Sequence, residues 1–410
     1  MKKLVSVVLA LIMTLGCVAL SSCGKKASEG ISVTLTDGAE IVIGVYEPAS
    51  GDNGPGGKQE TLGVRYANAV KPTVTIGGKT YNVKLKIVDN QSSNDKAPSA
   101  AAELINANSV AILGSYGSGV SIAAGESFKN AKVPAVGITC TNPQVTEGND
   151  YYFRVCFLDP FQGTVLAGYA KDLGTEKAYV LAQQGSDYDV GLATYFMEAF
   201  GKDACVYETF PKDNADFTSY VQKAIDEGAG VIFAPTSISY AQLIIAKADA
   251  LGYTGTMLAG DTWDSNQIVS AADGKNVKIE VTTFYQEGAN TEFDEGFRAW
   301  LNSDSQLLTD NGGNDMIAAV SVMGYDAYMT ALKAIESAAV TTNSAGESVL
   351  TSVAVRDSLA AMNTASAGYT GVTGTIYFNE IGDAARDTAF IKKVDTETAS
   401  WIFVKEQKAQ

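Results

Sequence analysis

The feature that most constrains this 410-residue chain is a repeated alternation of short apolar runs with helix-forming stretches. In its first half, apolar and β-branched runs occupy residues 41–47, 84–89, 109–114 and 133–138, with helical patterns between them. Runs of this length are typical of buried strands, and the intervening helices return the chain to the same edge of a sheet. The alternation therefore predicts a mostly parallel sheet covered by helices on both faces.

A second round of the same alternation begins after residue 157 and predicts a second α/β unit. The class predicted is thus α/β, with two doubly wound parallel-sheet lobes and a cleft between them. The expected elements of this second part are strands at 177–182, 205–210, 230–235, 256–261, 374–378, 389–394 and 401–405, and helices at 161–173, 190–200, 217–227, 240–251, 292–302, 315–337 and 350–362.

Polar loops that follow predicted strands are the candidate binding elements, because open α/β sheets bind ligands beyond the carboxyl ends of their strands. The loop at residues 115–120 offers hydroxyls, glycine-flanked backbone N–H groups and a helix N-terminus. Together these groups suit an anion such as a carboxylate. The alternative for Ser118 is that its hydroxyl only caps the following helix.

The next strand is followed by a loop at residues 138–146 that contains Thr139 and Thr141. A threonine hydroxyl both donates and accepts a hydrogen bond, so either residue suits a polar ligand. The alternative is an ordinary polar turn fixed by Asn142 and Pro143.

A carboxylate, Asp261, follows a later predicted strand and is expected to point into the cleft, where it needs a cationic partner. The alternative is that this turn only caps a helix through Asp264 or Ser265. An α-amino acid would satisfy all of these loops, with its carboxylate at Ser118 and Thr141 and its ammonium at Asp261.

The N-terminus has the layout of a secretory signal peptide, with two lysines, an apolar run over residues 4–20 and a Leu-Ser-Ser-Cys sequence ending at Cys23. That ending resembles the lipobox of bacterial lipoproteins. We therefore expect a signal peptide at 1–22, a lipid on Cys23 and a linker at 23–39, which together anchor the protein to the membrane outside the cytoplasm. The alternative is an uncleaved span, for which the run is at the short end of the usual range.

Composition excludes several classes of site. The chain has no histidine, which excludes Ser-His and Cys-His catalysis and histidine-containing zinc sites. Its net charge of −16 disfavours nucleic acid as a partner. Beyond the N-terminal segment only Cys140, Cys156 and Cys205 remain, too few for a four-cysteine metal site. A disulfide between two of them stays open, and no metal or cofactor is expected.

The chain resembles the extracellular ligand-binding proteins of the branched-chain amino acid (Leu/Ile/Val) uptake family. These are type I periplasmic binding proteins that serve ABC transporters. The resemblance covers roughly residues 40–405 and depends on the order and spacing of several segments. In chain order these are IVIGVYEPASG, VAILGSYGSGVS, VPAVGITCTNPQVT, YYFRVCFLDPFQG, GSDYDVG, LAGDTWDS, GYDAYMTALKAI and GVTGTIYFNEIGD.

The resemblance implies a ligand site residue by residue. Ser118 matches the serine that binds the ligand carboxylate, and Thr141 the threonine that bridges carboxylate and ammonium. Thr139 matches the neighbour whose backbone carbonyl accepts from the ammonium. Tyr188 matches a second-lobe tyrosine that closes over the ligand, and Asp261 the acidic residue that pairs with the ammonium.

The sequence departs from the family pattern around the ligand side chain. It lacks the aromatic residue that relatives place near Gly56, and it has Ser237 where they often have tyrosine. Tyr116 stands where an aliphatic residue is common, and Trp263 adds a second large ring. Leu, Ile or Val is therefore not assumed as the ligand. Tyr116 and Trp263 would favour an aromatic or flat ligand, and the alternative for both is core or rim packing.

The family fold implies one lobe at 40–157 plus 284–368 and another at 158–283 plus 369–405, with three hinge crossings. The expected mechanism is closure around a small ligand, an amino acid by its chemistry, followed by delivery to an ABC permease and its ATPases. A monomer without catalytic activity is expected.

Alternative functions differ from this one in the ligand or in the role of the cleft. A sensing surface receptor would share the fold, and an aromatic acid or amide would be a ligand without an ammonium. An enzyme is disfavoured because no P-loop is present and no GxGxxG follows the first strand. In a purely structural surface protein the cleft loops would be only caps and turns.

Overall fold

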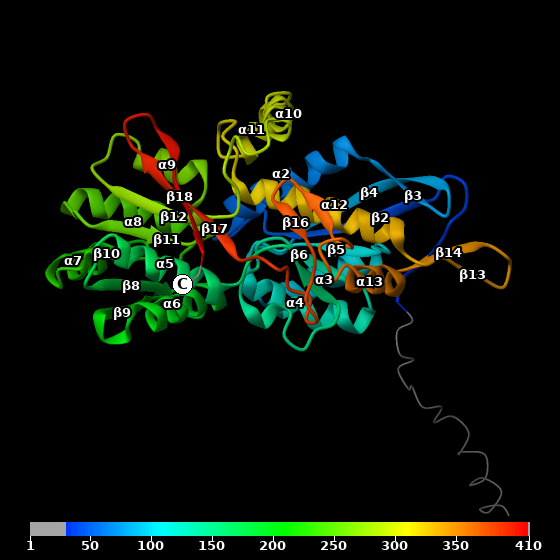
Figure 1. The fold of residues 1–410 in the computed structure, drawn as a ribbon, viewed down its shortest axis with the longest axis horizontal. Helices are drawn as coiled ribbons and strands as arrows, with labels where there is room; N and C mark the ends of the chain where they lie inside the picture. Colours follow the sequence, from blue (N-terminus) through cyan, green and yellow to red (C-terminus); the bar gives the residue numbers. More distant parts are fainter. Residues whose placement is uncertain (1–29, 409–410) are drawn as a thin grey trace, which may run out of the picture.

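The computed structural model describes residues 30–408 and shows two α/β lobes side by side (Figure 1). The first lobe contains a six-stranded sheet in the order β3-β4-β2-β5-β6-β7, parallel except for β3, which runs antiparallel to β4. The predicted α/β class is confirmed. The strands of this sheet are β2 (Glu40–Glu47), β3 (Thr73–Ile76), β4 (Lys79–Asp89), β5 (Ala111–Leu113), β6 (Ala135–Gly137) and β7 (Tyr152–Arg154).

Helices cover both faces of this first sheet, because its central strands carry buried apolar side chains on both sides. On one face α2 and α12 pack closely together. A Cβ placed on Gly63 of α2 would lie 1.8 Å from the Ser321 carbonyl oxygen of α12, so the close approach requires glycine. The helices are α2 (Gly54–Val70) and α12 (Ala319–Ser337) on one face, α3 (Ala97–Asn106) and α4 (Ser118–Ala131) on the other, and α13 (Ser352–Ala361) against α12.

The second lobe contains a seven-stranded sheet in the order β18-β17-β12-β11-β10-β8-β9. Strands β8 to β12 are parallel, while β17 and β18 are antiparallel. The strands are β8 (Ala178–Gln183), β9 (Cys205–Phe210), β10 (Val231–Phe233), β11 (Thr256–Ala259), β12 (Lys278–Thr283), β17 (Thr388–Asp395) and β18 (Ser400–Lys408). The covering helices are α5 (Asp159–Asp172) and α6 (Asp187–Phe200) on one face, and α7 (Thr218–Asp226), α8 (Ile238–Leu251) and α9 (Asn266–Ala272) on the other.

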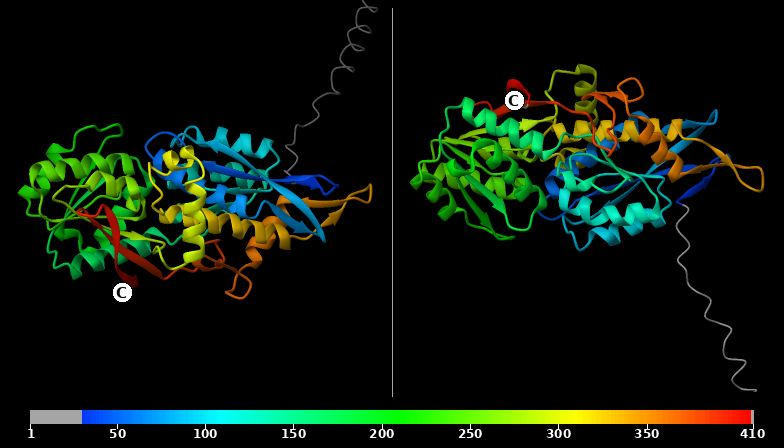
Figure 2. Two further views of the ribbon diagram at one scale, coloured as in Figure 1. Left: turned by 90° about the horizontal axis from the view of Figure 1, so that it is seen from above. Right: turned by 60° about the horizontal axis from the view of Figure 1, so that its bottom comes forward.

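Smaller elements complete the fold. Helices α10 (Thr291–Leu301) and α11 (Ser305–Asp310) form a projection over the junction of the lobes (Figures 1 and 2). A small sheet in the order β1-β14-β13 extends the first lobe. Its strands are β1 (Ser32–Thr34), β13 (Thr341–Thr342) and β14 (Ser348–Thr351), and the remaining elements are the hairpin β15 (Tyr369–Gly371) and β16 (Gly374–Ile376) and the short turns η1 (Pro143–Val145), η2 (Lys202–Ala204) and η3 (Asp261–Trp263).

The chain crosses between the lobes three times, and the crossings lie together. The rings of Phe157 and Phe284, on the first and second crossings, have centroids 4.2 Å apart. Arg386, on the third, donates through Nε to the carbonyl of Val155, on the first, at 2.8 Å. The lobe boundaries remain a proposal, with one correction. The expected third crossing at residue 369 is too early, because the hairpin β15–β16 packs on α12 of the first lobe.

Two further predictions concern attachment to the membrane and the state of the cysteines. The expected signal peptide and lipidated Cys23 lie outside the described residues. Between residues 30 and 408, no helix is both long enough and apolar enough to span a membrane. Cys140, Cys156 and Cys205 are free thiols, which answers the question of a disulfide left open by the sequence.

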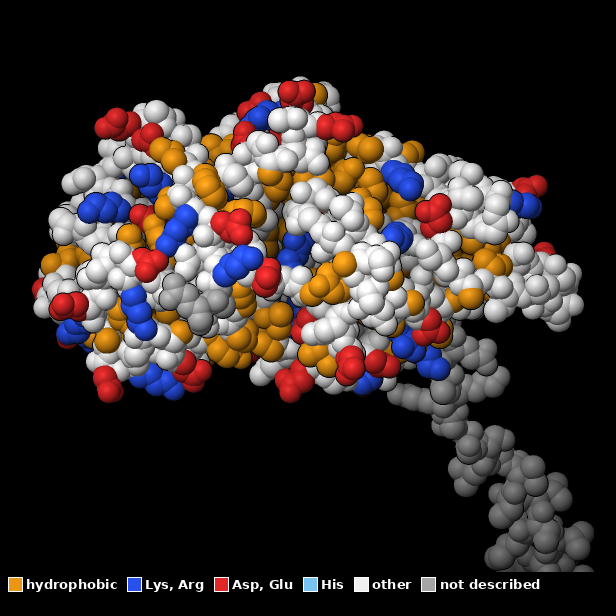
Figure 3. Space-filling view, in the orientation of Figure 1, with side chains coloured by type: hydrophobic (Ala, Val, Ile, Leu, Met, Phe, Trp, Pro, Cys, Tyr) orange, Lys and Arg blue, Asp and Glu red, His pale blue; other side chains and the backbone are white. Residues whose placement is uncertain are grey.

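Acidic and basic side chains are scattered over both lobes on the face shown in Figure 3.

Candidate functional site

A cleft of about 260 Å³ lies between the lobes at the carboxyl ends of their strands. The first lobe contributes the loops after β2, β4 and β5, and the second lobe those after β8, β9, β10 and β11. Of the predicted site residues, Tyr116, Ser118 and Tyr188 line this cleft directly. Thr139, Thr141, Asp261 and Trp263 are buried and are not among the residues that line it.

Ser118 is the first residue of α4 and does not cap it, because Gly117 holds the cap position and makes no side-chain bond. The Ser118 hydroxyl is almost fully buried and accepts a hydrogen bond from the backbone N–H of Asn142 at 3.3 Å. Since its oxygen is already used as an acceptor, its proton is available for a ligand. The capping alternative for Ser118 is wrong.

The two threonines after β6 differ in their environment. Thr139 donates its hydroxyl to the carboxylate of Glu60 on α2, so that hydroxyl is already engaged. Thr141 is fully buried and makes no side-chain hydrogen bond of normal geometry in the described chain, although its hydroxyl lies close enough to the Asp159 carboxyl to lower that group's pKa. A buried hydroxyl without a partner costs free energy, and Thr141 is therefore suited to bind a polar ligand group.

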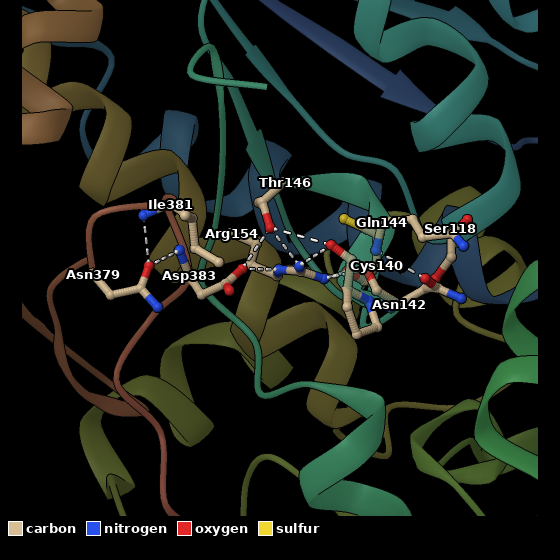
Figure 4. Close-up of polar contacts among 10 residues, drawn as sticks. Ser118, Cys140, Asn142, Gln144, Thr146, Arg154, Asn379, Ile381 and Asp383 are labelled. Atoms are coloured by element: carbon tan, nitrogen blue, oxygen red, sulfur yellow. Dashed lines mark hydrogen bonds and ion pairs between the residues drawn. The ribbon is translucent and has the colours of Figure 1, made fainter. Parts of the chain in front are cut away.

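Arg154 at the end of β7 fixes the backbone around Thr141 (Figure 4). Its Nη1 donates to the carbonyls of Cys140 at 2.8 Å and Asn142 at 2.7 Å, on either side of that threonine. Its Nε pairs with Asp383 at 2.6 Å, just before the third crossing. Arg154 was not predicted as part of the site, because its acidic partner Asp383 lies 229 residues away in the chain.

Asp261 begins η3 directly after β11 and is buried. Its Oδ1 accepts from Gln162 Nε2 at 2.7 Å and from Tyr188 OH at 2.9 Å, while Oδ2 has no partner. Burial raises the pKa of Asp261 to about 6, and the bonds from Gln162 and Tyr188 oppose that rise. At neutral pH Asp261 is thus an ionised carboxylate with one free oxygen, which suits an ammonium group.

Helix capping by the neighbouring residues Asp264 and Ser265 does not explain the free carboxylate oxygen of Asp261. Ser265 caps α9 through the N–H of Gln267, and Asp264 forms a buried ion pair with Lys392 at 3.1 Å. Both residues therefore have structural partners of their own. Asp261 alone keeps an oxygen free on this turn.

The two large aromatic residues proposed for the pocket have different positions. The ring of Tyr116 covers Gly56, where a Cβ would come within 2.2 Å of the ring. Its hydroxyl donates to the carbonyl of Thr262 in the other lobe at 3.2 Å. Trp263 is instead fully buried in the core of the second lobe, and its indole N–H donates to the carbonyl of Thr236 at 3.1 Å. The prediction that Trp263 contacts the ligand is therefore wrong.

Further buried carboxyl groups lie near the cleft and were not predicted. Asp159, the first residue of α5, is fully buried and neither of its oxygens has a hydrogen-bond partner. Burial raises the pKa of Asp159 to about 8; the nearby Thr141 hydroxyl opposes that rise, and the charge of Asp261 adds to it. Burial likewise raises the pKa of Glu60, which lies beside Glu47, to about 8. Only tertiary packing brings these helix residues together, so sequence spacing gave no signal for them.

The nearby buried cations have partners elsewhere. Arg154 is paired with Asp383, and Lys392 is paired with Asp264. In the part of the chain that the structure describes, no group of three or more metal-ligating side chains is arranged to hold a metal ion. Asp261 is therefore a buried carboxylate that forms no ion pair among the described residues.

The two lobes touch across the cleft. Asn142 Nδ2 of the first lobe donates to the Asp187 carbonyl of the second at 2.8 Å. Tyr240 OH of the second lobe lies 3.2 Å from Asp52 Oδ2 of the first. These hydrogen bonds close the cleft over Ser118 and Tyr188.

Comparison with known proteins gives a consistent set of matches. The profile of the family described as periplasmic binding protein matches residues 40–398. An amino acid binding protein of Pseudomonas aeruginosa is 27% identical over 254 residues, covering 60% of this chain and 67% of the relative. The Leu/Ile/Val-binding protein homolog 1 of Brucella abortus is 26% identical, covering 63% of this chain and 72% of the relative.

Solved structures share the fold. The leucine binding protein LivK of Thermotoga maritima is 29% identical with a TM-score of 0.75, covering 90% of this chain and 99% of that one. LivJ of Streptococcus pneumoniae, solved with isoleucine, is 22% identical with a TM-score of 0.75, covering 90% and 100%. A solute binding protein of Rhodopseudomonas palustris, solved with 3,4-dihydroxybenzoic acid, is 19% identical with a TM-score of 0.72, covering 90% and 98%.

Proposed function

This chain belongs to the periplasmic binding protein family and is a solute-binding component of an ABC transporter, and from that premise we propose that it captures an α-amino acid. The family acts outside the cytoplasm and delivers its solutes to membrane permeases. The relatives named for amino acids support the choice of ligand class.

One observation carries the proposal: the free polar atoms of the site complement an α-amino acid. Thr141 Oγ1 and Asp261 Oδ2 are buried without partners, and Ser118 has an unused hydroxyl proton. A ligand carboxylate would accept from Ser118 and Thr141, and a ligand ammonium would donate to Asp261. Charge-assisted hydrogen bonds of this kind offset the cost of removing a zwitterion from water.

Binding is proposed to proceed by closure of the lobes about their three crossings. Ser118 and Thr141 belong to the first lobe, whereas Tyr188 and Asp261 belong to the second. A ligand held by both pairs favours the closed form, because only that form makes all of the contacts. The closed surface is then the form that a permease would recognise.

A thermal-shift screen of the protein against the common α-amino acids tests this proposal. A ligand at a hundredfold excess over its Kd stabilises the folded state by about 2.7 kcal/mol, which raises the melting temperature. Asp261→Asn is expected to abolish the shift and Ser118→Ala to reduce it. The matched control is Asp203→Asn, at an exposed residue of η2 just before β9. Shifts only with ligands that lack an ammonium group would overturn the role of Asp261.

We further propose that the protein is anchored by lipid on Cys23 and acts as a monomer. The support for anchoring is the apolar run at residues 4–20 followed by Leu-Ser-Ser-Cys. Cys23→Ser is expected to prevent incorporation of a labelled fatty acid and to leave the protein unattached to membranes. Light scattering of the purified protein is expected to give the mass of one chain.

A further inference from the structure

The lining of the cleft is hydrophilic and acidic, unlike a pocket for a branched aliphatic side chain. Val120 is its only aliphatic side chain larger than a methyl group. Besides the hydroxyl and amide side chains, the lining contains several carboxylates and one opposing cation, Lys212. The carboxylates are Asp52, Asp95, Asp187 and Asp189.

These four aspartates differ in whether the protein already uses them. Asp52 accepts from Tyr240 at 3.2 Å, and Asp189 accepts from Ser186 and from the Gln183 N–H. The carboxylates of Asp95 and Asp187 form no hydrogen bond or ion pair within residues 30–408. These two are therefore available to a ligand.

An independent feature, the hydroxyl of Ser237, also points to a polar ligand group in this cleft. Ser237 lines the cleft and is only 5% exposed, yet its Oγ has no hydrogen-bond partner in the described chain. It occupies the cap position of α8 without making a capping bond. A buried hydroxyl left unpaired is costly, so a ligand donor or acceptor at this position would gain free energy.

The acidic part of the cleft lies within side-chain reach of the proposed α-amino acid clamp. Gly119 follows Ser118 directly, and a Cβ on Gly119 would lie 2.8 Å from Asp187 Oδ2 and 2.9 Å from Asn94 Oδ1. A ligand carboxylate bound at Ser118 would thus lie within about the length of one residue from the Asp187 carboxylate in space. A flexible side chain of several carbons can cover that separation.

From this arrangement we infer that the ligand is an amino acid with a basic side chain, whose ammonium or guanidinium is held by Asp95 and Asp187. The inference rests on the proposed function, because it assumes that Ser118 and Asp261 hold the α-groups. An aromatic acid would be a poorer ligand, since it brings no cationic group to these two carboxylates.

Titration calorimetry with two matched ligand pairs tests the inference. Arginine and citrulline have nearly the same shape but differ in charge, as do lysine and norleucine in the terminal ammonium. The protein is expected to bind the charged member of at least one pair at least tenfold more tightly than its neutral partner. Because Asp95 and Asp187 are partly solvent-exposed, raising the ionic strength is expected to reduce this ratio.

The double variant D95N/D187N tests the location of the side-chain site. Its charged-to-neutral affinity ratio is expected to fall toward one, because only the charged ligand forms ion pairs with these two residues. The control, Asp203→Asn, is expected to keep the full ratio. A ratio that survives in D95N/D187N would overturn the assignment to these two residues.

The possible failures are distinguishable. Neutral amino acids that bind as tightly as their charged partners would overturn this inference and leave the proposed function standing. If no α-amino acid binds at all, the proposed function falls, and this inference falls with it.

Discussion

At the scale of single residues, the protonation of Asp261 sets the pH range of binding. Its pKa is raised to about 6, and only the ionised carboxylate attracts an ammonium group. Affinity for the amino acid is therefore expected to fall below pH 6, approaching tenfold per pH unit. Calorimetry between pH 5 and 7.5 measures this profile. A flat profile in that range would contradict the role of Asp261.

Thr141 offers a test in which stability and binding change in different directions. Thr141→Val keeps the shape but removes a buried hydroxyl that has no partner in the protein. The free energy of unfolding is expected to stay the same or rise by about 1 kcal/mol. The Kd is expected to rise tenfold or more, because a hydrogen bond to a charged ligand group is worth about 1.5–3 kcal/mol. Chemical denaturation and calorimetry measure the two effects, and unchanged affinity would exclude Thr141 from the site.

Sequence reasoning proposed site residues that follow strands and missed buried groups whose positions depend on packing. Ser118, Thr141 and Asp261 were predicted because parallel strands bring their ends to one edge. Asp159 lies on a helix, and only the packing of α5 against the loop after β6 places its carboxyl group near Asp261. Trp263 was expected in the pocket because the sequence of a short turn after a strand does not show which way the tryptophan side chain points.

At the scale of elements, the buried ion pair between Arg154 and Asp383 joins β7, the loop after β6 and the segment before the third crossing. Arg154→Met is expected to lower the free energy of unfolding by about 3–5 kcal/mol, because it leaves Asp383 buried without its cation. It is also expected to weaken ligand binding, since the carbonyls on either side of Thr141 lose their donor. Chemical denaturation and calorimetry measure both effects.

A surface ion pair provides the control for Arg154. Lys202 lies 3.2 Å from Glu198 on the exposed side of α6, and Lys202→Met is expected to change stability little. A similar loss of stability in both variants would argue against a special role for Arg154. Unchanged binding in Arg154→Met would show that Thr141 holds its position without the arginine.

Most elements could be predicted from the sequence because the alternation of strands and helices is strong. The hairpin β15–β16 was assigned to the wrong lobe, although part of it was expected as a strand. The sequence of the hairpin does not show which of the two lobes it packs against. The contacts that do so come from α12, where Asp326 accepts from the N–H groups of Val372 and Thr373 at 2.9 and 2.8 Å.

At the scale of the whole molecule, hydrogen bonds between the lobes are expected to slow ligand release. Tyr240→Phe removes the hydroxyl that donates to Asp52 across the cleft and that also accepts from the Asp213 N–H within the second lobe, and it leaves the proposed ligand clamp intact. The closed form loses one contact, so the dissociation rate is expected to rise several-fold with little change in association. Stopped-flow fluorescence measures both rates.

The control for this substitution lies within one lobe. Tyr81 donates its hydroxyl to the Leu35 carbonyl, and both residues belong to the first lobe. Tyr81→Phe is expected to leave the dissociation rate unchanged. Equal rates in all three proteins would show that the Tyr240 contact does not resist opening.

The three crossings also determine the order in which this protein can fold. The first sheet is covered on one face by α12, which comes nearly two hundred residues after β6. The second sheet is completed by β17 and β18 at the end of the chain. The first lobe can therefore be completed only after α12 has been synthesised, and the second only after β17 and β18. We expect a nascent chain of this design to remain incompletely folded until those elements emerge, a state that suits passage of a polypeptide across a membrane before it folds.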